Sequence, residues 1–347
     1  MVAGIEASSP LPLAALGIAA VLSCASMACS RTAPGESYPP PAPSIEPYHE
    51  PPLAVFDDGF RVLRSDFPGR GYPTVLGAGE ARRSPDEGAE RFDRPAGEYV
   101  LFLEDPDSDW LRFVARDGSS HGWLDVRGIA VGDSVPEYLA RSDPGGRFRA
   151  ALARESGLLA PGSPFRRYGP LLVVGGPDRE VRIWDRFAGE GGSRRLLLVD
   201  RPLDGLLTFF WRTYGESGFL LYDLELGELA TLAGFPIFNV DASACYSYER
   251  QPNGGVLLEL LARDGEEWVC LIDLFLDEGF EPARLEPVWT DDGRALAIRI
   301  DSGVPVFIDL DDEALFEAAR NYGIGDSSLE TLYELIAAAY PEAFAGP

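Results

Sequence analysis

No lysine occurs among the 347 residues, and all 30 basic residues are arginine. The protein therefore cannot form a lysine Schiff base or use the lysine of a phosphate-binding loop. Only two histidines are present, His49 in a proline-rich stretch and His121 beside a turn glycine. Two of the four cysteines, Cys24 and Cys29, lie in the N-terminal leader, and with only the other two and two scattered histidines a four-ligand zinc site is implausible. We predict neither a metal nor another cofactor.

Positive charge is scarce relative to negative charge. The 56 acidic residues exceed the 30 basic ones and give a formal net charge of -26. Such an acidic surface repels nucleic acids and anionic lipid headgroups, so we expect no nucleic-acid partner. A hydrophobic share of 46% is ordinary for a globular protein, and the length suggests about two domains.

Residues 1–23 have the pattern of a secretory signal peptide. An apolar run from Leu11 to Ser23 ends at Cys24 and is shorter than the roughly 20 residues that a transmembrane helix needs. The segment 21–24 resembles the lipobox of bacterial lipoproteins, which implies that Cys24 is acylated. The resemblance implies an exported lipoprotein of the cell membrane or outer membrane, facing the periplasm or the cell surface. Cleavage before Cys29 and a soluble exported protein remain the alternatives.

Residues 24–54 form a proline-rich tether. Eight prolines lie between Pro34 and Pro52, a density that favours extended polyproline conformations over helix or central strand. Such a spacer is semi-rigid and would hold a domain away from a membrane anchor.

Residues 55–130 contain short strand-like runs separated by polar turns. The clearest runs are Tyr99 to Leu103, Trp110 to Ala115 and Gly122 to Val126, with Asp117-Gly118 as a hairpin turn. This order resembles the bacterial SH3 (SH3b) family, with an apolar strand, an acidic turn, a tryptophan strand, an Asp-Gly turn and Gly-Trp. Residues 78–96 would be a polar insertion in that family's pattern.

The SH3b resemblance implies a small SH3-like barrel that binds a peptidoglycan peptide or an envelope protein. It makes Tyr99, Trp110 and Trp123 candidate ligand-binding residues. The alternative is that the two tryptophans are core aromatics, because large aromatic side chains usually bury first. The acidic turn from Asp105 to Asp109 lacks the glycine and the final glutamate of an EF-hand loop, so we interpret it as a solvated turn.

The remaining chain predicts a second, larger β domain. Residues 131–165 read as a helical linker, and residues 166–311 alternate strands with Gly and Asp turns, as in an antiparallel meander. Segments such as Ile183-Trp184-Asp185 resemble blades of TolB-type or WD-type β-propellers. About three blades fit, fewer than a closed propeller needs, so we favour an open, propeller-like sheet stack over a propeller with a degenerate blade. Residues 312–347 have helical periodicity. The predicted fold class is mainly β.

No catalytic signature is found in the sequence. Gly215-Glu216-Ser217-Gly218 does not match the nucleophile elbow, and the glycine-rich segments lack phosphate-loop spacing. We expect a non-catalytic binding or scaffolding protein of the cell envelope, anchored in the membrane through its lipid. The alternative is a carboxylate-dependent glycan hydrolase, which would show two facing carboxylates in a cleft, one with a raised pKa.

Cys245 and Cys270 are the only cysteines beyond the leader. Two-residue turns at Asn253-Gly254 and Asp264-Gly265 would place their Cα atoms about 14 Å apart on opposite faces of a sheet. A disulfide requires a Cα separation of at most about 7 Å. We therefore expect two free, mostly buried thiols.

Overall fold

The computed structural model describes residues 50–66, 71–130, 146–175, 180–187, 194–213, 215–250, 255–276, 285–300 and 303–320. Residues 50–347 form one compact unit. The predicted signal peptide, Cys24, the tether up to residue 49 and the linker up to residue 145 lie outside the described residues. Within the described ranges, no helix is long and apolar enough to cross a membrane.

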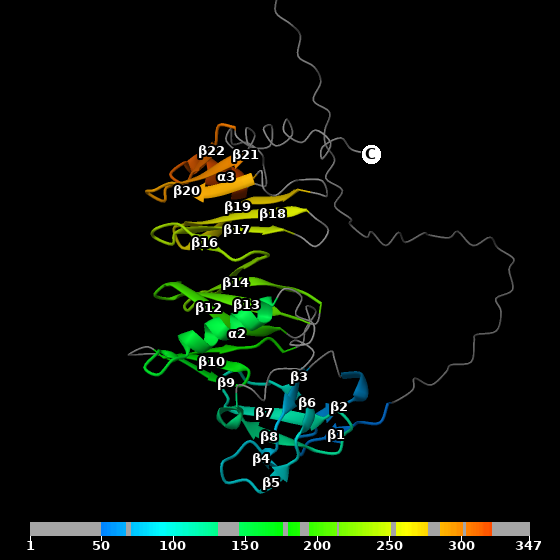
Figure 1. Ribbon diagram of the computed structural model, residues 1–347. Coiled ribbons are helices and arrows are strands. Elements are labelled where there is room, and N and C mark those ends of the chain that lie inside the picture. The colour runs from blue at the N-terminus through cyan, green and yellow to red at the C-terminus, as the bar shows by residue number, and fades with distance from the viewer. Residues whose placement is uncertain are drawn as a thin grey trace, which may run out of the picture. The chain divides into compact units, whose positions relative to one another are not determined.

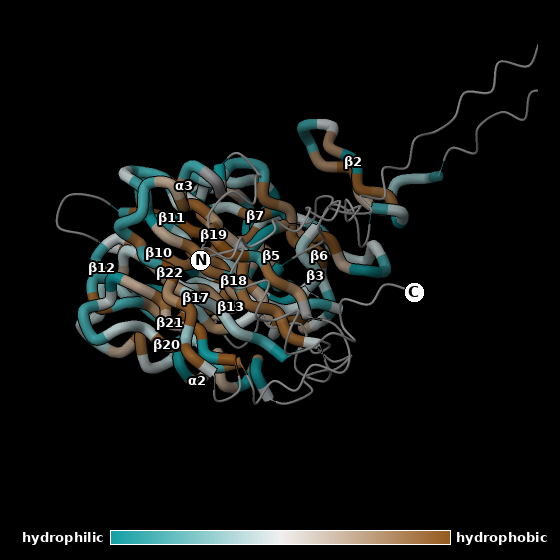
Figure 2. Tube along the Cα trace, turned by 90° about the horizontal axis from the view of Figure 1, so that it is seen from above, coloured by the Kyte–Doolittle hydropathy of each residue, from teal (hydrophilic) through white to brown (hydrophobic). Residues whose placement is uncertain are grey.

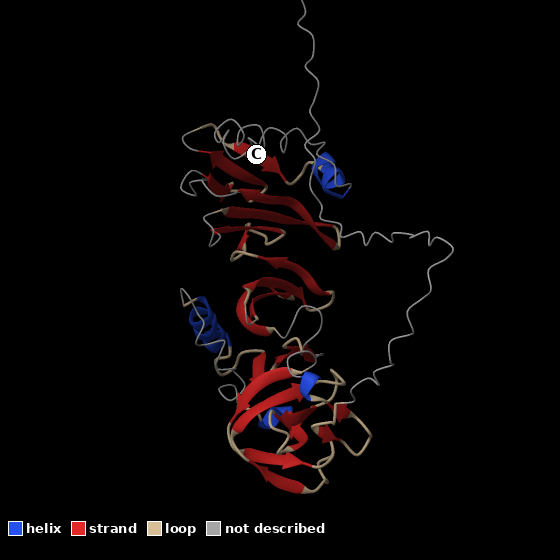
Figure 3. Ribbon diagram, turned by 90° about the vertical axis from the view of Figure 1, so that its right-hand side faces the viewer, coloured by secondary structure: helices blue, strands red, loops and turns tan. Residues whose placement is uncertain are grey.

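The N-terminal module, residues 54–129, is built on one six-stranded antiparallel sheet that curls around its own core (Figure 3). The predicted strand runs are confirmed, but residues 78–96 contain a hairpin of the same sheet. The strand order is β3-β6-β7-β8-β4-β5. The strands are β3 (Tyr72–Leu76), β4 (Gly79–Arg82), β5 (Arg91–Arg94), β6 (Gly97–Phe102), β7 (Trp110–Ala115) and β8 (His121–Asp125). A short hairpin of β1 (Ala54–Val55) and β2 (Arg61–Val62) precedes them, with 3-10 turns η1 (Arg64–Asp66) and η2 (Val126–Gly128).

Four antiparallel meanders follow, and each pairs its strands in chain order. Figure 1 shows them stacked one after another above the module. The first is β9 (Phe165–Tyr168), β10 (Leu171–Gly175) and β11 (Glu180–Trp184); the second is β12 (Arg195–Leu203), β13 (Leu206–Arg212), β14 (Ser217–Asp223) and β15 (Gly227–Leu232). The third is β16 (Ile237–Phe238), β17 (Ala244–Arg250), β18 (Val256–Asp264) and β19 (Glu267–Leu276); the fourth is β20 (Leu285–Trp289), β21 (Ala295–Ile300) and β22 (Val306–Asp309). The fold is mainly β with a propeller-like stack, as predicted, and it has one meander more than the three blades estimated.

Two helices lie at the sides of the stack (Figure 3). Helix α2 (Arg147–Leu158) buries Phe148 and Ala151 in the cluster between the second and third meanders. Helix α3 (Glu313–Arg320) places Leu315 and Phe316 in the cluster between the third and fourth. The helix predicted from residue 312 is therefore present up to Arg320, and the rest of that prediction lies outside the described residues.

Stacking explains why many strands are apolar on both faces. All seven residues of β13 are buried, since one face contacts the first meander and the other contacts the third. A strand between two layers needs no polar face. The sequence of β13 is therefore mostly apolar, with Thr208 and Arg212 as its polar residues, and does not alternate between apolar and polar side chains. Seen down the stack in Figure 2, brown strands occupy the middle and teal turns the periphery.

The N-terminal module and the first meander share one core. Leu171 and Val173 of β10 belong to the same buried cluster as the module's Leu101, Leu111 and Phe113. These side chains would be exposed to water if the two parts were separated. The module is therefore an integral end of the stack.

The acidic turn is exposed from Asp105 to Asp107, in line with its interpretation as a solvated turn, and its last residues also contact the first meander. Arg182 Nη2 donates to Asp109 Oδ1 at 2.6 Å and to the Ser108 carbonyl at 2.9 Å. The Trp184 indole N–H donates to the Pro106 carbonyl at 2.8 Å. Asp109 is thus the acidic residue of this turn that binds an arginine of the first meander.

A group of four buried charges connects α2 to the first two meanders. Arg195 Nη1 lies 2.6 Å from Asp185 Oδ2, and Arg167 Nη2 lies 2.6 Å from Glu155 Oε1. Arg167 also lies 3.5 Å from Asp185. All four side chains are almost completely buried. Two cations and two anions balance, which offsets much of the cost of removing them from water. The Trp184-Asp185 dipeptide of the sequence thus supplies the carboxylate of a buried structural ion pair.

Both cysteines beyond the leader are free, as predicted, although their predicted register is wrong. Leu261 pairs with Cys245 on one side and with Cys270 on the other, so the two cysteines share one row. Two strand spacings separate them by about 10 Å, still too far for a disulfide. An irregularity beside Leu261 leaves Leu271 and Ile272 both buried. Cys245 is buried as expected, whereas Cys270 is exposed.

Candidate functional site

The three aromatic residues predicted to bind ligand have different surroundings. Tyr99 is only 2% exposed and its hydroxyl donates to the Pro95 carbonyl at 2.6 Å. Its ring contacts Phe113 edge to face, with centroids 5.4 Å apart. Tyr99 is therefore a core residue and is removed from the candidate set. Trp110 and Trp123 are half-buried and face a common cavity.

This module cavity has a volume of about 260 Å³ and lies where β4, β5, β7 and β8 meet. The side chains that give it chemical character are the two indoles and four charged groups. These are Trp110, Trp123, Arg82, Arg94, Glu80 and Asp125. An aromatic surface beside both signs of charge suits a ligand with apolar and polar parts.

The two arginines of the module cavity differ in burial and in their partners. Arg82 lies over the Trp110 ring, 5.9 Å from its centroid, and bonds the Ala89 carbonyl at 3.2 Å. Arg94 is only 6% exposed and is fixed by a 2.6 Å bond from Nη2 to the Gly77 carbonyl. Its guanidinium lies over Tyr99, 4.9 Å from the ring centroid, and its Nε has no hydrogen-bond partner. Arg94 thus presents a fixed, buried positive charge to the cavity.

Close approach of two strands positions Arg82 and Trp123. The two residues are opposite each other where β4 meets β8. A Cβ on Gly122 would lie 2.6 Å from the Arg82 carbonyl oxygen and 2.9 Å from the Phe92 ring. Only glycine fits at such a close approach. The Gly-Trp pair of the sequence therefore sets the shape of the module cavity.

Arg112 supports Trp123 within an aromatic cluster. Its guanidinium lies 4.6 Å from the Trp123 ring centroid, 4.3 Å from that of Phe60 and 4.9 Å from that of Phe56. Its Nη1 also donates to Asp58 at 2.9 Å, and this hydrogen bond lowers the pKa of Asp58. Arg112 therefore fixes the β1–β2 hairpin and the Trp123 indole in one arrangement.

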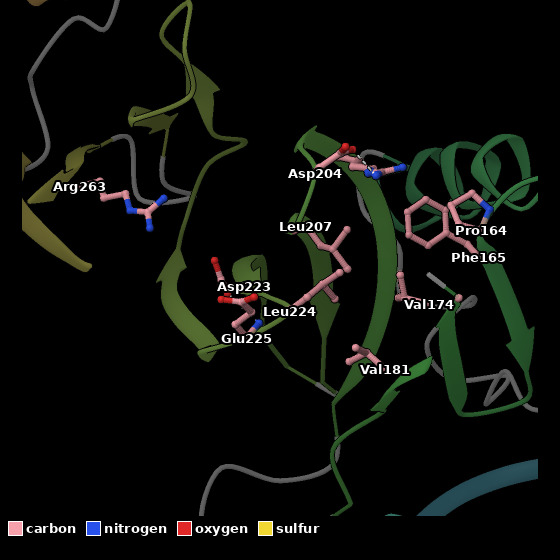
Figure 4. Close-up of a pocket in the computed structure, with 13 residues that line it drawn as sticks. Pro164, Phe165, Val174, Val181, Asp204, Leu207, Asp223, Leu224, Glu225 and Arg263 are labelled. Carbon is pink, nitrogen blue, oxygen red and sulfur yellow. Dashed lines mark hydrogen bonds and ion pairs between the residues drawn. The ribbon is translucent and has the colours of Figure 1, made fainter. Parts of the chain in front are cut away.

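A larger cavity, the stack cleft, runs along the side of the meanders and holds about 450 Å³ (Figure 4). Its floor is apolar and is made by residues of the first and second meanders. These are Phe165, Val174, Val181, Leu207 and Leu224. Its rim is charged and consists of Arg201, Asp204, Asp223, Glu225 and Arg263. No sequence motif indicated it, because its lining comes from three separate sheets.

The carboxylates of the stack cleft serve different purposes. Asp223 Oδ1 accepts the backbone N–H groups of Glu225 at 2.7 Å and of Leu226 at 3.0 Å, which shapes the turn after β14. Asp204 forms an ion pair with Arg201. Figure 4 shows Asp223 and Glu225 between the apolar floor and the guanidinium of Arg263.

Carboxylates with a raised pKa lie away from both cavities. Burial raises the pKa of Asp185, which belongs to the buried ion group. Burial also raises the pKa of Glu259, whose carboxylate accepts the Ser247 hydroxyl and the Ala233 N–H. Neither residue lines the module cavity or the stack cleft. Within the described residues, no group of three or more His, Cys, Asp and Glu could hold a metal ion.

No protein-family model matches the chain. No curated protein matches it either. A crystal structure of a proposed 6-phosphogluconolactonase from Bacteroides uniformis is 12% identical, with 71% of this chain and 94% of that chain covered and a TM-score of 0.25. A second one, from Bacteroides fragilis, is 10% identical over 70% and 94% of the two chains, with a TM-score of 0.18.

Prolyl oligopeptidase B from Galerina marginata is similar at 10% identity over 59% of this chain, with a TM-score of 0.20. The match spans 30% of that protein's length.

These neighbours correct one expectation. The two Bacteroides structures carry the name of an enzyme, which contradicts the prediction that this protein is not an enzyme, and we withdraw that prediction. The missing catalytic signature was a weak ground for it, because carboxylates are too abundant in this sequence for a catalytic pair to stand out. TM-scores of 0.25 and below assign no activity to this chain.

Proposed function

We propose that this protein is an exported, lipid-anchored binding protein of the bacterial cell envelope. Its module would bind a peptidoglycan peptide or an envelope protein in the cavity between Trp110 and Trp123. The observation that carries the proposal is the convergence of these two indoles on one cavity. The resemblance of the module's sequence to the SH3b family supplies the ligand class.

The chemistry of the module cavity supports a peptide ligand that bears a carboxylate. Arg94 is a buried cation with an unpaired Nε, and arginine is well suited to carboxylate recognition. The Trp110 and Trp123 rings offer apolar surface beside it. The acidic rim residue Glu80 lies 3.8 Å from Arg82, which keeps that arginine beside Trp110.

Sedimentation of the full chain with purified peptidoglycan tests the ligand. Trp110→Ala should weaken binding by about 30-fold, because loss of a tryptophan anchor typically costs about 2 kcal/mol. Phe307→Ala is the matched control, since Phe307 is 52% exposed on the fourth meander. A pull-down from envelope extract tests whether the module binds an envelope protein and not a peptidoglycan peptide. If neither peptidoglycan nor any envelope protein binds in a Trp110-dependent way, the proposal is wrong.

Membrane fractionation tests the anchor separately. Cys24→Ala should release the protein from the membrane fraction, because Cys24 is the predicted acylation site. The control is Cys29→Ala, which removes the competing cysteine and should leave the protein in the membrane fraction. Absence of lipid on the wild-type protein by mass spectrometry would contradict the anchor without affecting the module cavity.

A further inference from the structure

A second cavity lies beside the stack cleft and shares one lining residue, Arg263, with it. This helix hollow, with a volume of about 590 Å³, lies between the end of β18, the segment after β22 and helix α3. We refer to the two cavities together as the acidic groove.

The acidic groove has an apolar floor along its length. Phe165, Leu207 and Leu224 supply it in the stack cleft, and Leu310 and Phe316 supply it in the helix hollow. Apolar surface at the bottom of a concave site favours ligands that bring apolar groups of their own.

Negative charge dominates the rim of the groove. Seven carboxylates face three guanidiniums. Two of the arginines are already neutralised, because Arg201 pairs with Asp204 and Arg320 pairs with Asp264. The third, Arg263, bonds the Gly265 carbonyl through Nε at 3.0 Å.

Five carboxylates of the groove remain, of which Asp311 pairs with Arg294 and the other four create a negative potential. Those of Asp223 and Glu225 lie in the stack cleft, and those of Glu313 and Glu317 lie in the helix hollow. A cleft lined by one sign of charge concentrates ligands of the opposite sign.

The groove is long enough for an extended peptide. Its lining comes from the first, second and third meanders and from α3 beyond them. Packed sheets lie about 10 Å apart, so three such intervals span about 30 Å. An extended chain covers that distance with about nine residues at roughly 3.3 Å each.

We propose that the acidic groove is a binding site for an extended cationic peptide that alternates bulky apolar and basic side chains. The basic side chains pair with the rim carboxylates, and the apolar ones rest on the floor. This chain has no lysine and few unpaired arginines at the groove, so a foreign peptide is the natural source of the positive charge. The site is distinct from the module cavity and does not depend on it.

Fluorescence anisotropy with a labelled nine-residue peptide of alternating leucine and arginine tests the proposal on the full chain. Asp223→Asn combined with Glu225→Gln should weaken binding about tenfold, because two charges opposite the peptide are removed. The Asn side chain keeps the oxygen that accepts the turn N–H groups. Arg263→Gln should strengthen binding, because it removes a repelling cation.

Two controls separate the groove from the general acidity of the protein. Asp291→Asn combined with Glu87→Gln removes the same charge from exposed positions outside the groove and should change affinity less than twofold. A peptide with glycine in place of leucine tests the apolar floor and should bind at least tenfold more weakly. Equal weakening by both double variants would show that the groove has no special role. Equal binding of the two peptides would equally overturn the proposal.

Discussion

Arg182 of the first meander lies 2.6 Å from Asp109 in the acidic turn of the N-terminal module. The same guanidinium bonds the Ser108 carbonyl, and Leu171 and Val173 supply part of the module's core. Residues about 60 to 75 positions further along the chain thus contribute to the packing of the module. Ligand studies therefore need the full chain and not the excised module.

Removing this contact should destabilise the whole protein. Arg182→Gln is expected to lower the free energy of unfolding by about 1 to 3 kcal/mol, because it leaves the partly buried Asp109 and the Ser108 carbonyl without this donor. Urea denaturation of the full chain measures the loss. Arg116→Gln is the control, since its pair with Glu98 is exposed and should contribute less than about 0.5 kcal/mol. Equal effects of the two substitutions would show that the contact is not structural.

The buried ion group should be intolerant of losing one partner. Asp185→Asn removes the carboxylate that lies 2.6 Å from Arg195 in a fully buried region and leaves Glu155, which pairs with Arg167, as the remaining carboxylate of the group. Breaking a buried ion pair in this way typically costs about 3 to 5 kcal/mol. Chemical denaturation should show this loss, whereas Asp311→Asn, which breaks an exposed pair with Arg294, should change stability by less than about 0.5 kcal/mol. A small effect at Asp185 would mean that the buried arginines find other partners.

Glu259 should make the protein less stable as pH rises. Burial raises its pKa in the folded state, so the folded protein holds that proton more tightly than the unfolded chain. Its favourable contribution is complete below the ordinary pKa of glutamate and is lost as pH rises through the raised folded value. Glu259→Gln keeps an acceptor for the Ser247 hydroxyl and the Ala233 N–H.

The Glu259→Gln variant should therefore gain stability relative to wild type at pH 7 and not at pH 4. The gain should stay below about 1 kcal/mol, since solvent screens this partly exposed carboxylate. Denaturation at the two pH values measures it, and Glu267→Gln at the exposed start of the neighbouring strand is the control for a general charge effect. A gain of the same size at both pH values would contradict the prediction.

The two thiols should react at different rates in the folded protein. Cys270 is exposed as a residue, but partial burial of its thiol group raises the thiol pKa to about 11. The deeper burial of Cys245 raises the pKa of its thiol further. In a Cys24→Ser, Cys29→Ser background, a thiol reagent should modify Cys270 slowly at pH 8 and Cys245 only after unfolding. The Cys270→Ser variant should then show no thiol that reacts before unfolding. Titration of the unfolded, unreduced protein should give two thiols, and finding none would mean a disulfide.

The sequence was sufficient for the strands of the N-terminal module and for the repeated meanders. Hairpin turns such as Asp117-Gly118 are local signals, and mostly apolar runs such as β13 indicate burial on both faces. The register around Cys270 was wrong because the two-residue turn is Gly265-Glu266, between the paired Asp264 and Glu267, and not Asp264-Gly265. Glycine suits either central position of such a turn, so the local sequence does not choose between the two registers.

Local chain chemistry thus determined by itself the mainly β class and the turns. Only the tertiary structure decided that Tyr99 is buried while Trp110 and Trp123 line the module cavity, since the sequence offered all three strand aromatics equally as candidates. The acidic groove was also beyond sequence analysis. Its floor and rim come from residues up to about 150 positions apart, and stacking of separate sheets alone brings them together.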